Sequence, residues 1–141
     1  MRHFALLVLL AALSLACAGG GTTSTPRASE QRIDVALTDA LTIEPAEMIV
    51  KAGQPVIFVV ANSGAAVHEF YVGDEAAQAE HEREMAEMGG MPHDEPNGVA
   101  VQPGETKELA ITFDEPGQLI AGCHLPGHYP GGMRATITVT E

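Results

Sequence analysis

Basic residues are scarce in this sequence. Its 141 residues include seven Lys and Arg against nineteen Asp and Glu. Because phosphate binding needs clustered basic side chains, nucleic acid is not expected as a partner. All the acidic residues follow position 29, so the chain beyond an N-terminal leader carries a net charge near −13. This charge suits a metal ion or a cationic protein partner, and it also suits simple solubility.

Aromatic residues and cysteines are also few. Tryptophan is absent, and Val, Ile, Leu and Thr dominate the chain, which favours strands. The two cysteines are Cys17, close to the N-terminus, and Cys123. Exported proteins usually pair their cysteines. Cys123 therefore has either the ordinary role of a small buried side chain or a chemical one.

The longest apolar run lies at the N-terminus. Arg2 precedes apolar residues 4–15, and small residues surround Cys17. This pattern predicts a secretory signal over residues 1–18, which is too short to span a membrane as a helix. Cleavage before Cys17 would leave a lipid-modified cysteine, as in bacterial lipoproteins, whereas cleavage after Ala18 would remove it.

We favour lipidation of Cys17. A polar, flexible tether over residues 19–31 then follows the anchor. The expected location is the periplasm or the outer face of the cell membrane. Contact with the membrane is expected only through the lipid.

Residues 32–141 are enough for one domain. Apolar and polar residues alternate at 33–39 and 107–117, and a β-branched run at 55–64 predicts a strand that is buried on both faces or central in a sandwich. Further strands are predicted at 48–51, 67–74, 118–123 and 134–141. Seven or eight short strands separated by turns predict an all-β, Greek-key β-sandwich or barrel. Residues 75–97 interrupt this pattern, because an Ala- and Glu-rich stretch predicts a short helix from about 76 to 88.

The stretch CHLPGHYPGGM, residues 123–133, concentrates potential metal ligands. Four residues separate Cys123 from His128, and four more separate His128 from Met133. Glycine and proline allow a loop that folds back so that the three side chains point at one place. A thiolate, an imidazole and a thioether are ligands that suit copper. His68, in VHEFYV, is the candidate for a fourth ligand.

The order His68, Cys123, His128, Met133 resembles the cupredoxin family, and the loop is similar to those of the auracyanin and rusticyanin type. The stretch before His68 also resembles the family's strand that leads to its first histidine. The resemblance runs from about residue 33 to 141. It implies one type 1 (blue) copper ion with His68, Cys123 and His128 as equatorial ligands and Met133 as the axial one.

The resemblance further implies a monomeric one-electron carrier that docks weakly on a redox partner. The expected site of electron exit is His128 with the apolar residues around it, which are Leu125, Pro126, Tyr129 and Pro130. Glu69 departs from many members, which have Asn after the first histidine. Its carboxylate either perturbs the copper site or points away, as the next residue of a strand does. His124 is expected to be an exposed loop residue.

The helical segment offers a second group of metal-binding residues. His81, Met85 and Met88 share one helix face, and Met91 and His93 follow. They could bind a second copper ion, although a methionine stripe more often packs on a sheet. The rival function is accordingly copper handling for resistance, storage or delivery. Enzyme motifs are absent from the sequence, so catalysis is not expected.

Overall fold

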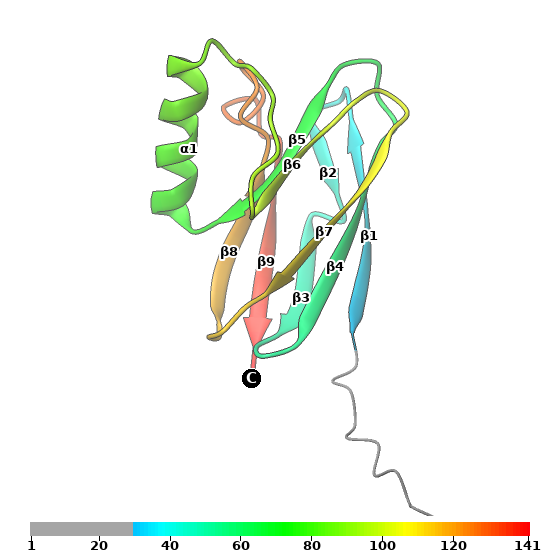
Figure 1. Ribbon diagram of the computed structural model, residues 1–141, viewed down its shortest axis with the longest axis vertical. Helices are drawn as coiled ribbons and strands as arrows, with labels where there is room; N and C mark the ends of the chain where they lie inside the picture. Colours follow the sequence, from blue (N-terminus) through cyan, green and yellow to red (C-terminus); the bar gives the residue numbers. More distant parts are fainter. Residues whose placement is uncertain (1–29) are drawn as a thin grey trace, which may run out of the picture.

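The computed structural model describes residues 30–141. The predicted signal, Cys17 and the tether up to residue 29 lie outside the described residues. Two β-sheets face each other, with one helix beside them (Figure 1). The first sheet has the strand order β2 (Thr42–Glu44), β1 (Gln31–Thr38), β4 (Pro55–Asn62), β7 (Thr106–Thr112). The second has the order β3 (Glu47–Lys51), β9 (Arg134–Thr140), β8 (Gly117–Gly122), β5 (His68–Gly73), β6 (Gly98–Val101).

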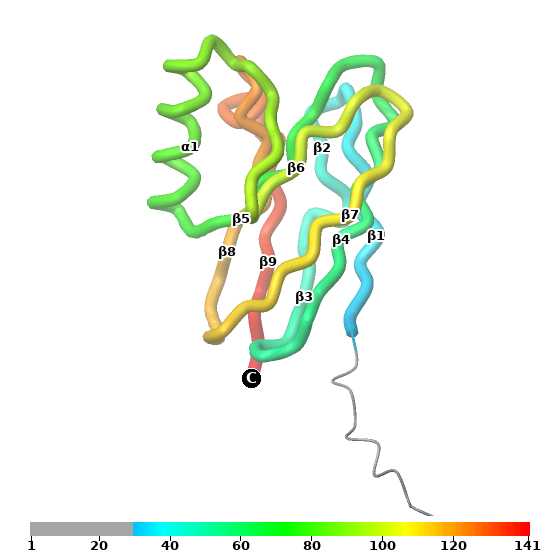
Figure 2. The backbone as a smooth tube through the Cα atoms, viewed as in Figure 1, coloured from blue at the N-terminus to red at the C-terminus, as the bar shows by residue number. Residues whose placement is uncertain are grey.

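Neighbouring strands are antiparallel except in two places. β1 pairs parallel to β4, and β3 pairs parallel to β9. A tube through the backbone shows how β7 crosses from the upper to the lower end of the molecule, where the chain passes into β8 of the other sheet (Figure 2). This two-sheet arrangement confirms the predicted β-sandwich.

The strand count is nine within residues 30–141, two more than the seven segments located from the sequence. The additional strands are β2, of three residues, and β6, of four. β6 has the sequence GVAV and is buried throughout, so it shows no alternation to detect. β4 lies between β1 and β7, and buried positions alternate along it with partly exposed ones. It is therefore central in its sheet, and the alternative of burial on both faces is wrong.

The core lies between the two sheets. Alternating residues of β4 and β9 project into it, including Phe58 and Ile137, and both side chains are fully buried. Phe58 packs against Phe70 of β5 and Phe113, with ring centroids 5.3 Å and 6.5 Å apart. These aromatic contacts join the two sheets across the core.

Helix α1 (Glu75–Glu87) covers the outer face of β5 and β8. The Asp74 carboxylate accepts a hydrogen bond from the Ala77 N–H (2.8 Å), which caps the first turn. Gly89 and Gly90 follow the helix with positive φ angles and bond back to its last carbonyls. The predicted helix is thus confirmed to within one residue at each end.

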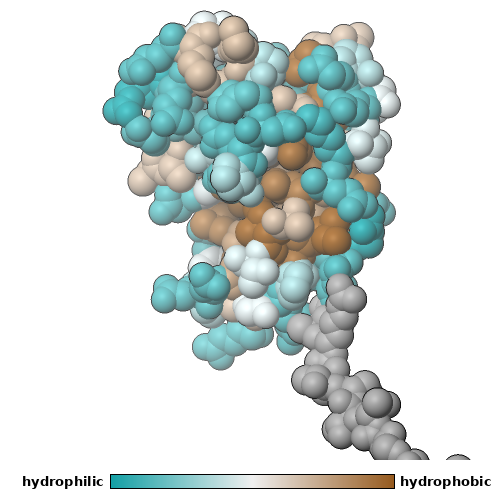
Figure 3. Space-filling model, viewed as in Figure 1, coloured by the Kyte–Doolittle hydropathy of each residue, from teal (hydrophilic) through white to brown (hydrophobic). Residues whose placement is uncertain are grey.

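The buried face of α1 is unusual because it is mostly polar. Its buried residues are Gln78, His81 and Met85. In the view of Figure 3 the region of the helix is mainly hydrophilic, and hydrophobic residues gather lower on the same face of the molecule. In the part of the chain that the structure describes, no helix is long and apolar enough to cross a bilayer.

Removing the Phe58 ring tests the aromatic core. Phe58→Ala leaves a cavity between the sheets, so we expect the free energy of unfolding of the metal-free protein to fall by about 3–5 kcal/mol in chemical denaturation. Ile49→Ala is the control, because Ile49 is 66% exposed and its truncation should change stability by less than about 0.5 kcal/mol. Equal losses in both variants would contradict this account of the core.

Candidate metal centre

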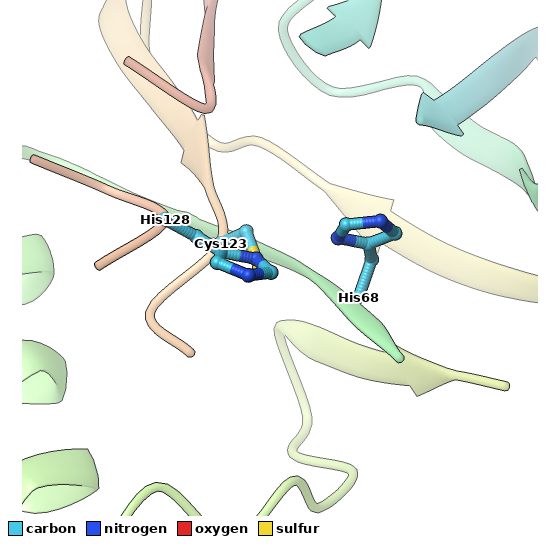
Figure 4. A group of neighbouring side chains, drawn as sticks. All are labelled: His68, Cys123 and His128. Carbon is cyan, nitrogen blue, oxygen red and sulfur yellow. The ribbon is translucent and has the colours of Figure 1, made fainter. Parts of the chain in front are cut away.

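Three of the four predicted ligands lie together at one end of the sandwich. His68 begins β5, whereas Cys123 and His128 lie on the loop between β8 and β9 (Figure 4). One donor atom from each lies within 4.8 Å of the other two. The Cys123 Sγ is 3.3 Å from the His128 Nδ1, and the two imidazole centroids are 5.1 Å apart. This is one thiol and two imidazoles converging on one point, as the sequence predicts.

The imidazole of His68 is held by one nitrogen and leaves the other free. Its Nε2 lies 3.0 Å from the Asp39 carboxylate, while Nδ1 is buried without a hydrogen-bond partner among residues 30–141. A carboxylate on the remote nitrogen fixes the ring orientation and makes the near nitrogen a better ligand. The unpaired Nδ1 is thus the atom that a metal ion would satisfy.

The loop before His68 is also fixed by side chains. Asp39 accepts hydrogen bonds from the N–H groups of Ala65 and Ala66, and these bonds, with His68, lower the pKa of its carboxyl. Asn62 is buried, and its amide donates to the carbonyls of Ala66 and Val101, both at 2.8 Å. Asn62 therefore shapes the turn that leads to His68 and is not one of the three converging residues.

The loop of Cys123 and His128 closes on Met133 through the backbone. The N–H of Cys123 donates to the Met133 carbonyl (3.1 Å), and the N–H of Met133 donates to the His128 carbonyl (3.0 Å). The Met133 side chain is fully buried. Gly127 and Gly132 adopt positive φ angles of 85° and 99°, which the sharp turns require. These bonds tie the three residues of the loop to one another.

Burial controls the protonation of both loop ligands. Desolvation raises the pKa of the Cys123 thiol to about 11. Desolvation is the larger cause, and the nearby His68 the smaller one, of a lowered pKa at His128. The Cys123 sulfur accepts a hydrogen bond from the Glu69 N–H (3.3 Å), an interaction that favours the thiolate. A soft cation with affinity for sulfur and imidazole nitrogen fits this donor set, and copper meets that description.

Glu69 points away from the three converging ligands. Strand alternation places its carboxylate on the outer side of β5, where it is buried and accepts a hydrogen bond from the His124 N–H (3.1 Å). Its other oxygen lies 3.0 Å from His81 of α1. Of the two alternatives for Glu69, the structure supports the second.

The prediction that His124 is exposed is wrong. The residue is 2% exposed, because α1 covers it. Its Nδ1 lies 2.5 Å from the Glu82 carboxylate and its Nε2 lies 2.6 Å from the Gln78 Oε1. The imidazole also stacks on Tyr129 with centroids 4.3 Å apart. His124 thus fastens the ligand loop to the helix.

The predicted second group is only partly assembled. His81 and His93 come together, with ring centroids 5.9 Å apart. Met85 belongs to the hydrophobic core, as a packed methionine stripe would, whereas Met88 and Met91 are 44% and 67% exposed. The thioethers are thus divided between core and solvent, and the residues around the two imidazoles are carboxylates instead.

The predicted electron exit has a mixed surface. Pro126 and Pro130 are exposed, His128 and Tyr129 are half-buried, and Leu125 is buried.

Residues important to the centre that sequence reasoning missed are Asp39, Gln78 and Glu82. Asp39 contacts His68, whereas Gln78 and Glu82 contact His124 beside Cys123. Each lies far along the chain from the residue it contacts, and a lone Asp, Gln or Glu gives no sequence signal for such a contact.

Comparison with known proteins gives consistent results. The family model of copper-binding proteins of the plastocyanin/azurin family matches residues 30–140. The chain is 36% identical to the copper-resistant cuproprotein CopI of Pseudomonas aeruginosa, covering 79% of this chain and 77% of that protein. It is 33% identical to the protein of the same name from Rubrivivax gelatinosus, covering 79% and 67%.

Among solved structures, reduced auracyanin from Roseiflexus castenholzii matches with a TM-score of 0.70 and 27% identity, covering 81% of this chain and 99% of that one. These findings confirm the cupredoxin resemblance, the fold class and copper as the cofactor. The chain belongs to the plastocyanin/azurin family of copper-binding proteins.

Proposed function

We propose that this protein is an exported one-electron carrier whose single copper ion is held by His68, Cys123 and His128, with Met133 as the axial ligand. The observation that carries the proposal is the buried Nδ1 of His68, which has no hydrogen-bond partner among residues 30–141, in a residue with one ring nitrogen within 4.8 Å of the Cys123 sulfur and of a His128 nitrogen. A buried imidazole nitrogen without a partner is costly unless a ligand satisfies it.

The residues around the centre are suited to electron transfer. Bound copper supplies the Cu(II)/Cu(I) couple. Asp39 fixes the ring of His68, and the backbone bonds between Cys123, His128 and Met133 fix the loop, so the ligands keep their places when the charge changes. The side chains of His68, Cys123 and Met133 are fully buried and exclude water. The hydrogen bond from the Glu69 N–H to the sulfur adjusts the reduction potential.

Electrons would leave and enter through His128, the most exposed of the three converging ligands. The exposed Pro126 and Pro130 flank it and offer a small apolar surface. Such a surface suits weak, transient docking of a redox partner on a monomer. The strongly acidic chain favours a cationic partner and disfavours nucleic acid. In this proposal the protein transfers electrons and catalyses no reaction of its own.

An optical and EPR titration with Cu(II) tests the ligand set. We expect an intense visible thiolate-to-copper band that saturates at one equivalent in the wild-type protein. Cys123→Ser should lose the band, because the sulfur donor is gone. Met133→Gln should keep the band at a shifted position, since the axial ligand tunes the site. A band that survives in Cys123→Ser would contradict the assignment.

The affinity for Cu(II) should increase with pH. The pKa of the Cys123 thiol is raised to about 11, so near neutral pH copper must displace a proton from it. We expect the apparent affinity to rise about tenfold per pH unit between pH 6.5 and 8, as measured by competition with a chelator of known pH dependence. In Cys123→Ser this contribution should disappear. A slope that is the same in both proteins would contradict displacement of the thiol proton.

A second candidate function is copper handling, and the names of two relatives favour it, because both are called copper-resistant cuproproteins. Redox cycling beside a Cu(I) chelator distinguishes the two functions. For a carrier, reduction should bleach the visible band and reoxidation should restore it in full, since copper is retained. For a copper-handling protein, the chelator should capture the copper after reduction, and the band should not return.

A further inference from the structure

A second group of potential ligands lies on the other side of β5, under helix α1. Donor atoms of His81, Glu84 and Glu95 lie within 4.8 Å of one another. Two further residues adjoin them: the Glu69 Oε1 is 3.0 Å from the His81 Nε2, and the His93 Nε2 is 2.8 Å from the Glu95 Oε1. We call these five residues the outer cluster.

His81 is the observation that distinguishes the outer cluster from a solvated acidic surface. The residue is 1% exposed, and neither ring nitrogen makes a hydrogen bond of acceptable geometry with any of residues 30–141. Its neighbour Glu69 is equally buried. A buried imidazole whose nitrogens lack well-formed hydrogen bonds carries a desolvation penalty. An ion coordinated by one nitrogen of the ring would remove the penalty for that nitrogen.

The imidazole of His81 is also held in position. It stacks on Tyr71 with centroids 3.9 Å apart and an interplanar angle of 5°, and the His124 ring stands at 88° to it, 5.1 Å away. The helix supplies Glu84 one turn later, at 3.9 Å from the His81 Nδ1. The return loop supplies Glu95, at 3.5 Å, and two backbone bonds between Glu95 and Gly98 hold that loop against β6. Ordered surroundings of this kind preorganise ligands.

The donor set indicates the class of ion. It consists of imidazole nitrogen and carboxylate oxygen without sulfur, which suits a divalent transition metal in a tetragonal arrangement. Among such ions Cu(II) binds nitrogen and oxygen ligands most strongly. We propose that the outer cluster is a second metal site, distinct from the His68–Cys123–His128 centre, and that it binds Cu(II) through His81, Glu84 and Glu95 with Glu69 and His93 beside them.

Glu69 connects the two sites. Its carboxylate belongs to the outer cluster, and its backbone N–H donates to the sulfur of Cys123. An ion bound at the Nδ1 of His81 would make the Nε2–H on the other side of the ring a stronger donor to the Glu69 carboxylate, and this would alter the hydrogen bond from the Glu69 N–H to the sulfur. Occupancy of the outer cluster therefore shifts the visible band of the first centre.

The test is a Cu(II) titration of the purified full chain followed by EPR. We expect a second equivalent to give a signal with wide hyperfine splitting, typical of nitrogen and oxygen ligands, and a small shift of the visible band at the same point. In Glu84→Gln/Glu95→Gln the second equivalent should bind at least about tenfold more weakly and the shift should be lost. His81→Gln should have the same effect. The Glu84→Gln/Glu95→Gln variant keeps the test decisive if His81→Gln fails to fold, because Glu84 and Glu95 are partly exposed whereas His81 is buried.

Glu75→Gln/Glu87→Gln is the matched control. It removes the same charge from exposed positions of α1 and should bind the second equivalent as the wild type does. Repeating the count in Cys123→Ser separates this site from the first, because the outer cluster needs no thiolate. A stoichiometry of one, or equal weakening in the control and test variants, would overturn the proposal. Displacement of the second Cu(II) by equimolar Zn(II) would overturn the assignment to copper.

Discussion

The pairing of β5 with β8 is the constraint on which both groups of candidate ligands depend. Tyr71 lies opposite Gly122, and this register places the start of β5 beside the end of β8. His68 and Cys123 therefore meet although 54 residues separate them along the chain. Alternation along β5 then turns His68 toward the inside of the sandwich and Glu69 toward α1. A shift of one residue in this pairing would exchange the two side chains.

Helix α1 stabilises the centre from outside by polar contacts. Gln78 and Glu82 hold the imidazole of His124, the residue that follows Cys123. Gly90, just past the helix, approaches Pro126 so closely that a Cβ atom there would lie 2.6 Å from the ring. Gly122 leaves room for Gln78 and Tyr129 in the same way. Because the buried face of α1 is polar, its contacts are directional and fix the loop in one position.

The sequence predicted the parts of this protein that depend on local pattern and on residue type. Alternation, β-branched runs and turn residues located seven of the nine strands of residues 30–141, and the spacing from Cys123 to Met133 identified the candidate ligand loop. The short β2 and β6 carry too few residues for a period to emerge. The burial of His124 could not be predicted, because it depends on Gln78 and Glu82, more than 40 residues away. Helix spacing and the loop after the helix likewise pointed to His81 and His93 as potential ligands. Of the carboxylates beside them, Glu84 belongs to α1, whereas Glu69 comes from β5 and Glu95 from the return loop.

The direction of β1 determines the end of the domain at which the preceding part of the chain is attached. β1 starts at Gln31 and ends at Thr38, and the next residue, Asp39, holds His68. Eight residues of strand span about 26 Å. Whatever precedes residue 30 therefore joins the domain at the end opposite His68, Cys123 and His128. If the chain is attached to a surface through its N-terminus, the face around His128 points outward, toward proteins that approach from the solvent and away from the attachment.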